Sequence, residues 1–207
     1  MVDVLELASS GRAKCRGCGR AIAKGELRFG ESLPNAYAEG EALYWFHPVC
    51  AACMRPEKFG ALLGAFESNI EDREWLRRTA DFGTAHRRLP RLARAERASS
   101  GRAHCHQCRD LIAKGVFRVA LQMFEEGRMS PIGYIHVGCA EPYFGTRDIL
   151  DRVRRLTSGL SEEDLAEIER TLRDAAPVVE VELRLAKTRP EPETLAAASG
   201  DRANSKG

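Results

Sequence analysis

Apolar residues follow two different patterns along the chain, and each pattern occurs in both halves. Short aliphatic and aromatic segments near 26–31, 43–46, 116–124 and 132–135 predict strands. Longer segments with helical character predict helices at 57–67, 70–80, 85–97, 146–157 and 161–174. Strands followed by helices, twice over, predict an α+β chain made of two small modules with short antiparallel sheets.

Local signals refine these elements. Pro48 directly after His47 is typical of a helix start, since proline is tolerated in the first turn. Ser161 followed by Asp164 resembles a capping box at the start of the last helix. Residues 178–185 alternate and predict a further strand, whereas 176–207 as a whole mix proline, serine, glycine and charge and predict a mostly disordered tail.

A metal-ligand pattern occurs once in each half. The two patterns are Cys-x2-Cys-x28-His-x2-Cys and Cys-x2-Cys-x27-His-x2-Cys. Three thiolates and one imidazole make a complete tetrahedral shell for Zn²⁺, with no open position for water or substrate. We therefore expect two structural zinc ions per chain. Their ligands are Cys15, Cys18, His47, Cys50, Cys105, Cys108, His136 and Cys139.

Cysteine usage and composition narrow the setting. Of the seven cysteines, six belong to the two ligand sets and only Cys53 is left over. This spacing favours metal over disulfides, which predicts a reducing, intracellular compartment: cytoplasm or nucleoid in a bacterium, nucleus in a eukaryote. No leader-like segment opens the sequence, and no apolar run approaches a membrane span. Cys53 reads as a buried hydrophobe rather than a competing ligand.

The two halves are copies of one unit. Ala-Ser-Ser-Gly-Arg-Ala-x-Cys occurs at 8–15 and 98–105, and Ile-Ala-Lys-Gly-x-x-Arg at 22–28 and 112–118. The offset is 90 residues in both blocks and 89 at the histidines, so the loop between the ligand pairs changes length. The predicted divisions are a finger at 1–55, an Arg-rich helical extension at 56–97, a second finger at 98–145, a helical extension at 146–175, and the tail.

Charge is distributed unevenly although the formal net charge is only +2. Basic residues gather around the first ligand pair of each unit, and the stretches that follow lean acidic. A phosphate-binding face requires such clustering, while the alternative is an ordinary solvated surface. The run from Arg73 to Arg97 is also rich in arginine, and a third DNA contact and a solvated helical linker remain equal alternatives there.

The repeated residues resemble a known family. Ser10-Gly11-Arg12-Ala13-x-Cys15, Leu27-Arg28 and Tyr44-Trp45-Phe46-His47, with their counterparts in the second copy, are similar to the zinc fingers of poly(ADP-ribose) polymerases, which also occur on a nuclear DNA ligase. The resemblance covers about 8–55 and 98–145 and does not extend to a catalytic domain. It implies binding to DNA strand breaks without sequence preference, through backbone phosphates and stacking on an exposed base pair.

The resemblance also implies roles for individual residues. Phosphate contacts are expected from Arg12, Lys14, Arg16, Arg28, Arg102 and Arg118. Base-stacking candidates are Tyr37, Ala38, Ala42, Leu43, Met129, Pro131 and Ile132. Both stacking sets are expected in loops, at Leu33–Leu43 and Phe124–Ile132. Tyr44 and Trp45 read as packing under the zinc site rather than as base stackers.

The function expected is therefore a non-enzymatic, zinc-dependent protein that recognises nicks, gaps or ends in DNA, in repair or damage sensing. The alternative is a zinc-finger adaptor that recruits a repair enzyme. An enzyme ranks below both, because no nucleophile, phosphate loop or carboxylate pair is recognisable. We expect DNA as the partner, a repair enzyme as a second one, and neither a membrane nor a small-molecule substrate.

Overall fold

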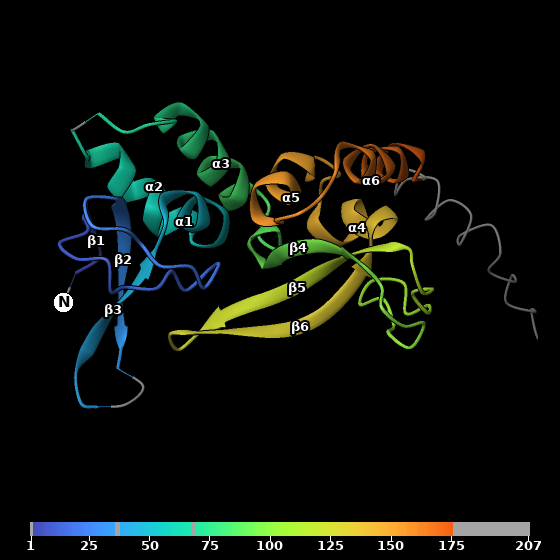
Figure 1. Cartoon of the computed structure of the whole chain (residues 1–207), viewed down its shortest axis with the longest axis horizontal. Helices are drawn as coiled ribbons and strands as arrows, with labels where there is room; N and C mark the ends of the chain where they lie inside the picture. The colour runs from blue at the N-terminus through green and yellow to red at the C-terminus, as the bar shows by residue number, and fades with distance from the viewer. Residues whose placement is uncertain (1, 36–37, 68, 176–207) are drawn as a thin grey trace, which may run out of the picture. The chain divides into compact units, whose positions relative to one another are not determined.

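The computed structural model describes residues 2–35, 38–67 and 69–175 (Figure 1). Two three-stranded antiparallel sheets carry the two ligand sets. The first sheet contains β1 (Val4–Leu7), β2 (Leu27–Pro34) and β3 (Glu41–Phe46), in that order. The predicted tail and the predicted strand at 178–185 lie outside the described residues.

The second sheet repeats the first. It contains β4 (Leu92–Arg97), β5 (Phe117–Glu125) and β6 (Arg128–His136), again in sequence order. Each sheet is a meander because the central strand pairs with the strands before and after it. The predicted α+β class and the two short antiparallel sheets are confirmed.

Helices follow each sheet. α1 (Pro48–Met54), α2 (Pro56–Ala65) and α3 (Arg73–Ala85) follow the first. Pro48 occupies the first turn of α1 with His47 as its N-cap, as the sequence predicts. The third helix begins and ends a few residues later than the predicted 70–80.

The helical part of the second half is more divided. It comprises the 3₁₀ turns η1 (Leu89–Arg91) and η2 (Val137–Cys139), then α4 (Ala140–Phe144), α5 (Leu150–Leu156) and α6 (Glu162–Asp174). Ser161 accepts a hydrogen bond from the Asp164 amide, and the Asp164 carboxylate accepts one from the Ser161 amide, so the predicted capping box is confirmed. None of the helices in the described part of the chain is both long and apolar enough to cross a membrane.

The predicted helix over 85–97 is wrong. Only Leu89–Arg91 turn helically, and Leu92–Arg97 form the first strand of the second sheet. Leu92 and Ala95 are buried there while Arg94 and Arg97 are exposed, a spacing of three that mimics a helix. The strand carries an irregularity between Leu92 and Arg94, which shifts its alternation and explains the misleading spacing.

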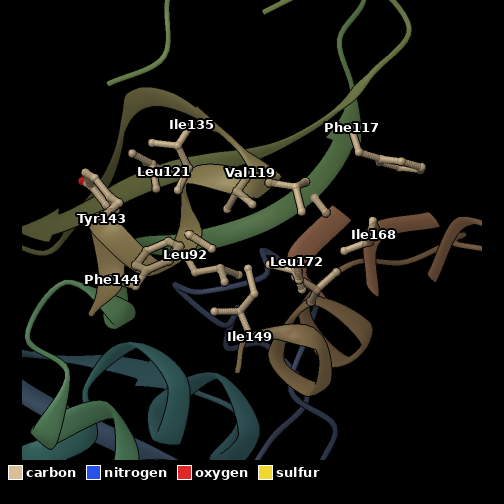
Figure 2. Close-up of a cluster of buried hydrophobic side chains, with 14 of the residues drawn as sticks. Leu92, Phe117, Val119, Leu121, Ile135, Tyr143, Phe144, Ile149, Ile168 and Leu172 are labelled. Carbon is tan, nitrogen blue, oxygen red and sulfur yellow. The ribbon is translucent and has the colours of Figure 1, made fainter. Parts of the chain in front are cut away.

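Each sheet packs beneath its own apolar cluster. Phe29, Phe46 and Phe59 are fully buried in the first cluster, and Phe59 meets Phe29 edge to face at 5.8 Å. In the second cluster, side chains from β4, β5 and β6 face residues of α4, α5 and α6; Figure 2 shows Val119 and Ile135 on the sheet side and Ile168 and Leu172 on the helix side. Each module therefore has a buried core of its own, and a few residues of the other module, such as Phe124 and Phe82, pack against it.

Arg152 of α5 connects the two modules. Its side chain is 4% exposed, and it donates hydrogen bonds to the carbonyl oxygens of Cys53 (2.9 Å) and Thr79 (2.6 Å) in the first module. Cys53 lies in the last turn of α1, where carbonyl groups lack an intrahelical donor, whereas Thr79 lies in the interior of α3. A buried carbonyl group without a donor is costly. This arginine therefore satisfies polar groups of α1 and α3 from a helix of the other module.

We expect Arg152→Met to destabilise the chain by about 2–4 kcal/mol, because it leaves both carbonyl oxygens without their buried cationic donor. Thermal or urea unfolding of the zinc-loaded protein measures the change. Arg154→Met is the matched control: Arg154 is exposed and its contact with Glu162 is 3.4 Å long, so the loss should stay below about 0.5 kcal/mol. Equal effects of the two variants would contradict the assigned role.

Candidate metal centres

The first ligand set is assembled by a tight turn, a strand end and a helix start. Cys15 and Cys18 flank a turn closed by hydrogen bonds from the Cys15 amide to Arg20 O (2.8 Å) and from the Gly19 amide to Cys15 O (2.9 Å). Gly19 has φ +74°, a conformation that glycine adopts without a steric penalty. The histidine follows β3 directly, so the sheet carries it to the turn.

The second set is built in the same way. The Cys105 amide donates to Asp110 O (2.8 Å) and the Arg109 amide to Cys105 O (3.0 Å), which closes the equivalent turn. Arg109 occupies the left-handed position, with φ 71°, that Gly19 occupies in the first turn. His136 ends β6, and Cys139 ends the short helical turn η2.

Each set converges on one point. The four ligand atoms of each set lie within 4.8 Å of one another. Tetrahedral zinc with Zn–S bonds of about 2.3 Å holds its sulfur ligands about 3.8 Å apart, so both sets fit one Zn²⁺ ion each. The predicted Cys3His sites and the two zinc ions are thereby confirmed.

Backbone groups orient the two histidines. Nδ1 of His47 lies 3.4 Å from Cys18 Sγ, and Nδ1 of His136 lies 3.4 Å from Cys108 Sγ, so Nδ1 faces the thiolates in both. Nε2 lies 3.3 Å from the carbonyl oxygens of Ala21 and Leu111, respectively. A carbonyl that accepts the Nε2 proton leaves the Nδ1 lone pair for the metal. Both sites therefore select the same imidazole tautomer.

Further hydrogen bonds support the thiolates. The backbone amides of His47 and His136 donate to Cys15 Sγ and Cys105 Sγ, each at 3.4 Å. Hydrogen bonding to a thiolate favours the charged form that binds metal. A closed shell of this kind serves structure and provides no open position for catalysis.

Gly17 is required by the close packing of the first centre. A Cβ atom at this position would lie 2.9 Å from Cys50 Cβ and 2.8 Å from Met54 Sδ. Real side chains do not approach so closely, so any other residue would displace the helix that carries Cys50. The turn thus holds a glycine for a packing reason.

Cys53 takes no part in either centre. It lies one turn after Cys50 in α1, is 1% exposed, and packs in the first apolar cluster. Burial raises the pKa of its thiol to about 11, so the group is neutral at pH 7. The interpretation of Cys53 as a small buried hydrophobe is confirmed.

The part of the chain that contains the first metal centre is similar to a known protein family. Residues 6–81 match the family described as the poly(ADP-ribose) polymerase and DNA-ligase Zn-finger region. The first module is therefore similar to the zinc fingers of this family. The match spans the first ligand set, the end of β1, the strands β2 and β3 and the helices α1 and α2, and it extends into α3. The second module shares the ligand set and the strand order with the first module.

Curated relatives of the chain carry the same family name. A poly [ADP-ribose] polymerase of Sarcophaga peregrina is 26% identical over 191 residues, which cover 81% of this chain and 19% of that protein. Poly [ADP-ribose] polymerase 1 of Gallus gallus is 30% identical over 133 residues, which cover 57% of this chain and 13% of that protein. The chain thus spans less than a fifth of the length of these relatives.

Basic side chains surround the turn of each centre. Arg12, Lys14 and Arg16 are exposed in the first module, and Arg102 is exposed at the equivalent of Arg12. Lys14 pairs with Ala21 across the turn through an isolated β-bridge, and His104 pairs with Leu111 in the same way. The metal centre therefore fixes the backbone that carries these basic side chains. Their contact with phosphate remains a prediction.

Arg28 and Arg118 have a different environment from the other four basic residues of the predicted set. Arg28 is 8% exposed; it pairs with Glu6 (2.5 Å) and its guanidinium lies 3.5 Å from the centre of the Trp45 ring. Their strands β1, β2 and β3 lie side by side, so the three side chains form a layer across the sheet.

The second module repeats this layer. Arg118 is 6% exposed, pairs with Glu96 (2.6 Å) and lies 3.5 Å from the Tyr134 ring centre. Sequence reasoning did not select the two glutamates, although Glu6 and Glu96 are separated by the same 90 residues as the two arginines. This shared offset is the sequence signal that identifies the two glutamates as part of the repeated unit.

The stacking candidates are dispersed. Tyr37 lies outside the described residues, Ala38 is exposed at the end of the first hairpin, and Leu43 is half-buried in β3. Pro131 is exposed in β6, and Ile132 packs partly against the second apolar cluster.

Two further candidates, Ala42 and Met129, pack partly against the first apolar cluster. Phe124–Ile132 was expected as a loop and is instead the end of the β5–β6 hairpin. Its two-residue turn, Glu126-Gly127, has φ 49° and 75°, which is typical of a type I′ turn.

The arginine-rich run does not form one surface element. Its members lie in α3, in the turn between α3 and η1, in η1 and in β4. Arg97 pairs with Asp164 (2.9 Å) and Glu167 (2.8 Å) of α6, and Arg94 pairs with Glu96 (2.7 Å). Arg77, Arg78, Arg87 and Arg88 are exposed. Part of the run therefore stabilises the second module, and a DNA contact remains open only for the exposed members.

Zinc analysis tests the ligand assignment. We expect two zinc ions per chain, one in Cys105→Ser, and two in the matched control Cys53→Ser, because only Cys105 is a ligand. Removal of both ions by a chelator should unfold both modules, since structural zinc supplies on the order of 10–16 kcal/mol in zinc fingers. Plasma emission spectrometry and circular dichroism measure the two effects. One ion in Cys53→Ser, or a chain that stays folded without zinc, would contradict the assignment.

Proposed function

We propose that the chain binds DNA without sequence preference and recognises strand breaks through zinc-supported basic surfaces. The observation that carries the proposal is the exposed basic set around the turn of the first metal centre, in the part of the chain similar to the zinc-finger family, with Arg102 at the equivalent place in the second module. Guanidinium groups form paired hydrogen bonds with phosphate oxygens, and the metal centre lowers the entropy lost when such groups are ordered.

The surface chemistry favours the sugar-phosphate backbone as the ligand. Arg12, Lys14 and Arg16 lie within five residues of chain that the first centre fixes on one turn. Phosphates recur along every DNA strand irrespective of base, so contacts of this kind carry no sequence information. Recognition of a break then requires a second feature, namely an exposed apolar face against which a terminal base pair stacks.

The end of the first hairpin is the best candidate for that stacking face. Its described part includes the exposed Ala38, and the Asn35 amide donates to Gly40 O (2.9 Å) to close the loop at its base. Nicks and ends expose a base pair without the cost of unstacking it, while intact duplex does not. A preference for breaks follows from that difference.

The buried arginines have a supporting role in this proposal. Arg28 donates through Nε and Nη2 to one carboxylate oxygen of Glu6 and lies flat on Trp45, so it is held rigidly at the sheet surface. A phosphate contact from it would use a pre-ordered guanidinium. Its replacement should therefore affect both the stability of the finger and DNA binding, unlike replacement of an exposed arginine.

The proposal places the protein inside the cell, in DNA repair or damage sensing, and assigns it no catalysis of its own. A closed Cys3His shell has no position for substrate, which supports a binding role for these modules. Recruitment of a repair enzyme is the natural use of a break-binding protein. The alternative is an adaptor that binds only protein, and a DNA-binding experiment distinguishes the two functions.

Binding to three DNAs of one sequence tests the proposal: a covalently closed duplex circle, a nicked circle and a blunt linear duplex. We expect tighter binding to the nicked and blunt forms, and steep weakening between 50 and 200 mM salt, because bound phosphates release counterions. Fluorescence anisotropy measures both effects. Equal affinity for all three DNAs would remove break recognition, and no binding at low salt would favour the adaptor.

Two variants separate phosphate contact from folding. Arg12→Ala should weaken binding to all DNAs and reduce the slope of log affinity against log salt by about 1, with an unchanged melting temperature. Arg28→Ala should lower the melting temperature as well, since it leaves Glu6 and Trp45 without their partner. Glu57→Ala, on the exposed face of α2, is the control and should change neither property. An unchanged salt slope in Arg12→Ala would contradict the assigned contact.

A further inference from the structure

The β5–β6 hairpin ends against the first module rather than in solvent. Phe124 and Met129 are cross-strand neighbours near its turn, so their side chains lie on one face of the hairpin. Both are partly buried and pack against the apolar cluster of the first module. The hairpin thus contributes side chains to a core that belongs to the other half of the chain.

Aromatic contacts define this packing. The Phe124 ring meets Phe46 edge to face at 5.2 Å and 82°, and meets Tyr44 at 6.3 Å and 72°. Arg55, at the end of α1, lies 5.1 Å from the centre of the same ring. Such pairs contribute about 0.5–1.5 kcal/mol each beyond the burial of their area. Phe46 directly precedes the zinc ligand His47, so the contact reaches the metal centre within one residue.

The turn of the hairpin approaches Tyr44 closely. A Cβ atom at Gly127 would lie 2.2 Å from the Tyr44 ring, and the backbone there has φ +75°. Only glycine meets both conditions at once. Gln122, further along β5, donates from Nε2 to Met54 Sδ at 3.5 Å. Hairpin and finger are therefore in contact from the turn to the middle of the strand.

A second group of contacts lies between α3 and α5. Trp75 donates from Nε1 to Asp151 (2.6 Å), and Arg155 lies 3.8 Å from the centre of the Trp75 ring. Arg152 adds its buried hydrogen bonds to Cys53 O and Thr79 O. Apolar packing at the hairpin and polar contacts at the helices together restrain both translation and rotation of one module against the other.

The two hairpins therefore differ in what they contact. The first ends in the loop that contains exposed Ala38, whereas the second ends in a two-residue turn against Tyr44. This difference coincides with the one-residue change in spacing, 28 against 27, between the ligand pairs. The face of the second hairpin that carries Phe124 and Met129 is covered by the first module and is therefore closed to a base pair.

We propose that the β5–β6 hairpin is an intramolecular docking element that joins the two modules into one rigid unit, and that a base pair at a break stacks at Ala38, on the end of the first hairpin, rather than on the second hairpin. The part of this statement that concerns stacking rests on the proposed function. The second module then supplies phosphate contacts and orientation. The pair binds a break asymmetrically, with one end of the unit defined as the stacking end.

The docking is tested without DNA. Residual dipolar couplings of the zinc-loaded full chain should fit one alignment tensor for both modules, and thermal unfolding should show one transition. In Phe124→Ala the two modules should need separate tensors, and exchange of the Tyr44 and Phe46 amides should accelerate about tenfold or more. Met123→Ala is the matched control, since Met123 precedes Phe124 on β5 and points to the opposite face. Separate tensors in the unaltered protein would overturn the proposal.

Phe124→Ala would lose zinc if it failed to fold, so a milder variant is needed to test the docking in that case. Trp75→Phe keeps an aromatic ring at this position, although a smaller one, and removes the hydrogen bond to Asp151, so it should retain two zinc ions and still increase the motion between modules. Two zinc ions with the motion of the unaltered protein in both Trp75→Phe and Phe124→Ala would overturn the docking role.

The stacking part is tested on nicked and closed circles. Ala38→Asp should reduce the preference for the nicked circle several-fold, and Pro131→Asp, at an exposed position of the second hairpin, should leave it unchanged. The reverse result would assign stacking to the second hairpin and overturn the proposal. If the unaltered protein shows no preference for nicks, the proposed function fails, and a single alignment tensor would still support the docking of the two modules.

Discussion

Four-ligand coordination of zinc is the constraint on which each module depends. In the first module one ion joins the turn of Cys15 and Cys18 to the end of β3 and the start of α1. A module of this size buries too little apolar surface to hold those segments together unaided. Coordination fixes them, and the hydrogen bonds from His47 to Ala21 O and from its amide to Cys15 show that the surrounding backbone is arranged for the metal.

The sheet transmits that constraint to the basic residues. Glu6, Arg28 and Trp45 form a layer across three strands, and Glu96, Arg118 and Tyr134 form the same layer in the second sheet. Two kinds of arginine thus occur beside each centre. One kind is buried and holds the strands in register, and the other is exposed on the turn. We assign the proposed DNA contact chiefly to the exposed arginines, because the guanidinium groups of the buried arginines are already engaged in ion pairs.

Duplication has produced two modules with equal centres and unequal surroundings. Their ligand sets, turns and sheet order agree, yet the first hairpin ends in a loop and the second ends in a tight turn against Tyr44. Phe124 makes the contact that distinguishes the second hairpin, since its ring packs against Phe46 and Tyr44 of the other module. The difference in packing coincides with the one-residue difference in spacing between the ligand pairs.

The sequence by itself determined the ligands, the duplication, the central strands and the helix starts at Pro48 and Ser161, because each depends on neighbouring residues or fixed spacing. Only the tertiary structure decided the strands β1 and β4, the burial of Arg28 and Arg118, and the docking of Phe124. Those features depend on partners more than 20 residues away, such as Glu6 for Arg28. Local pattern contains no information on such pairing, which is why a strand at 92–97 resembled a helix.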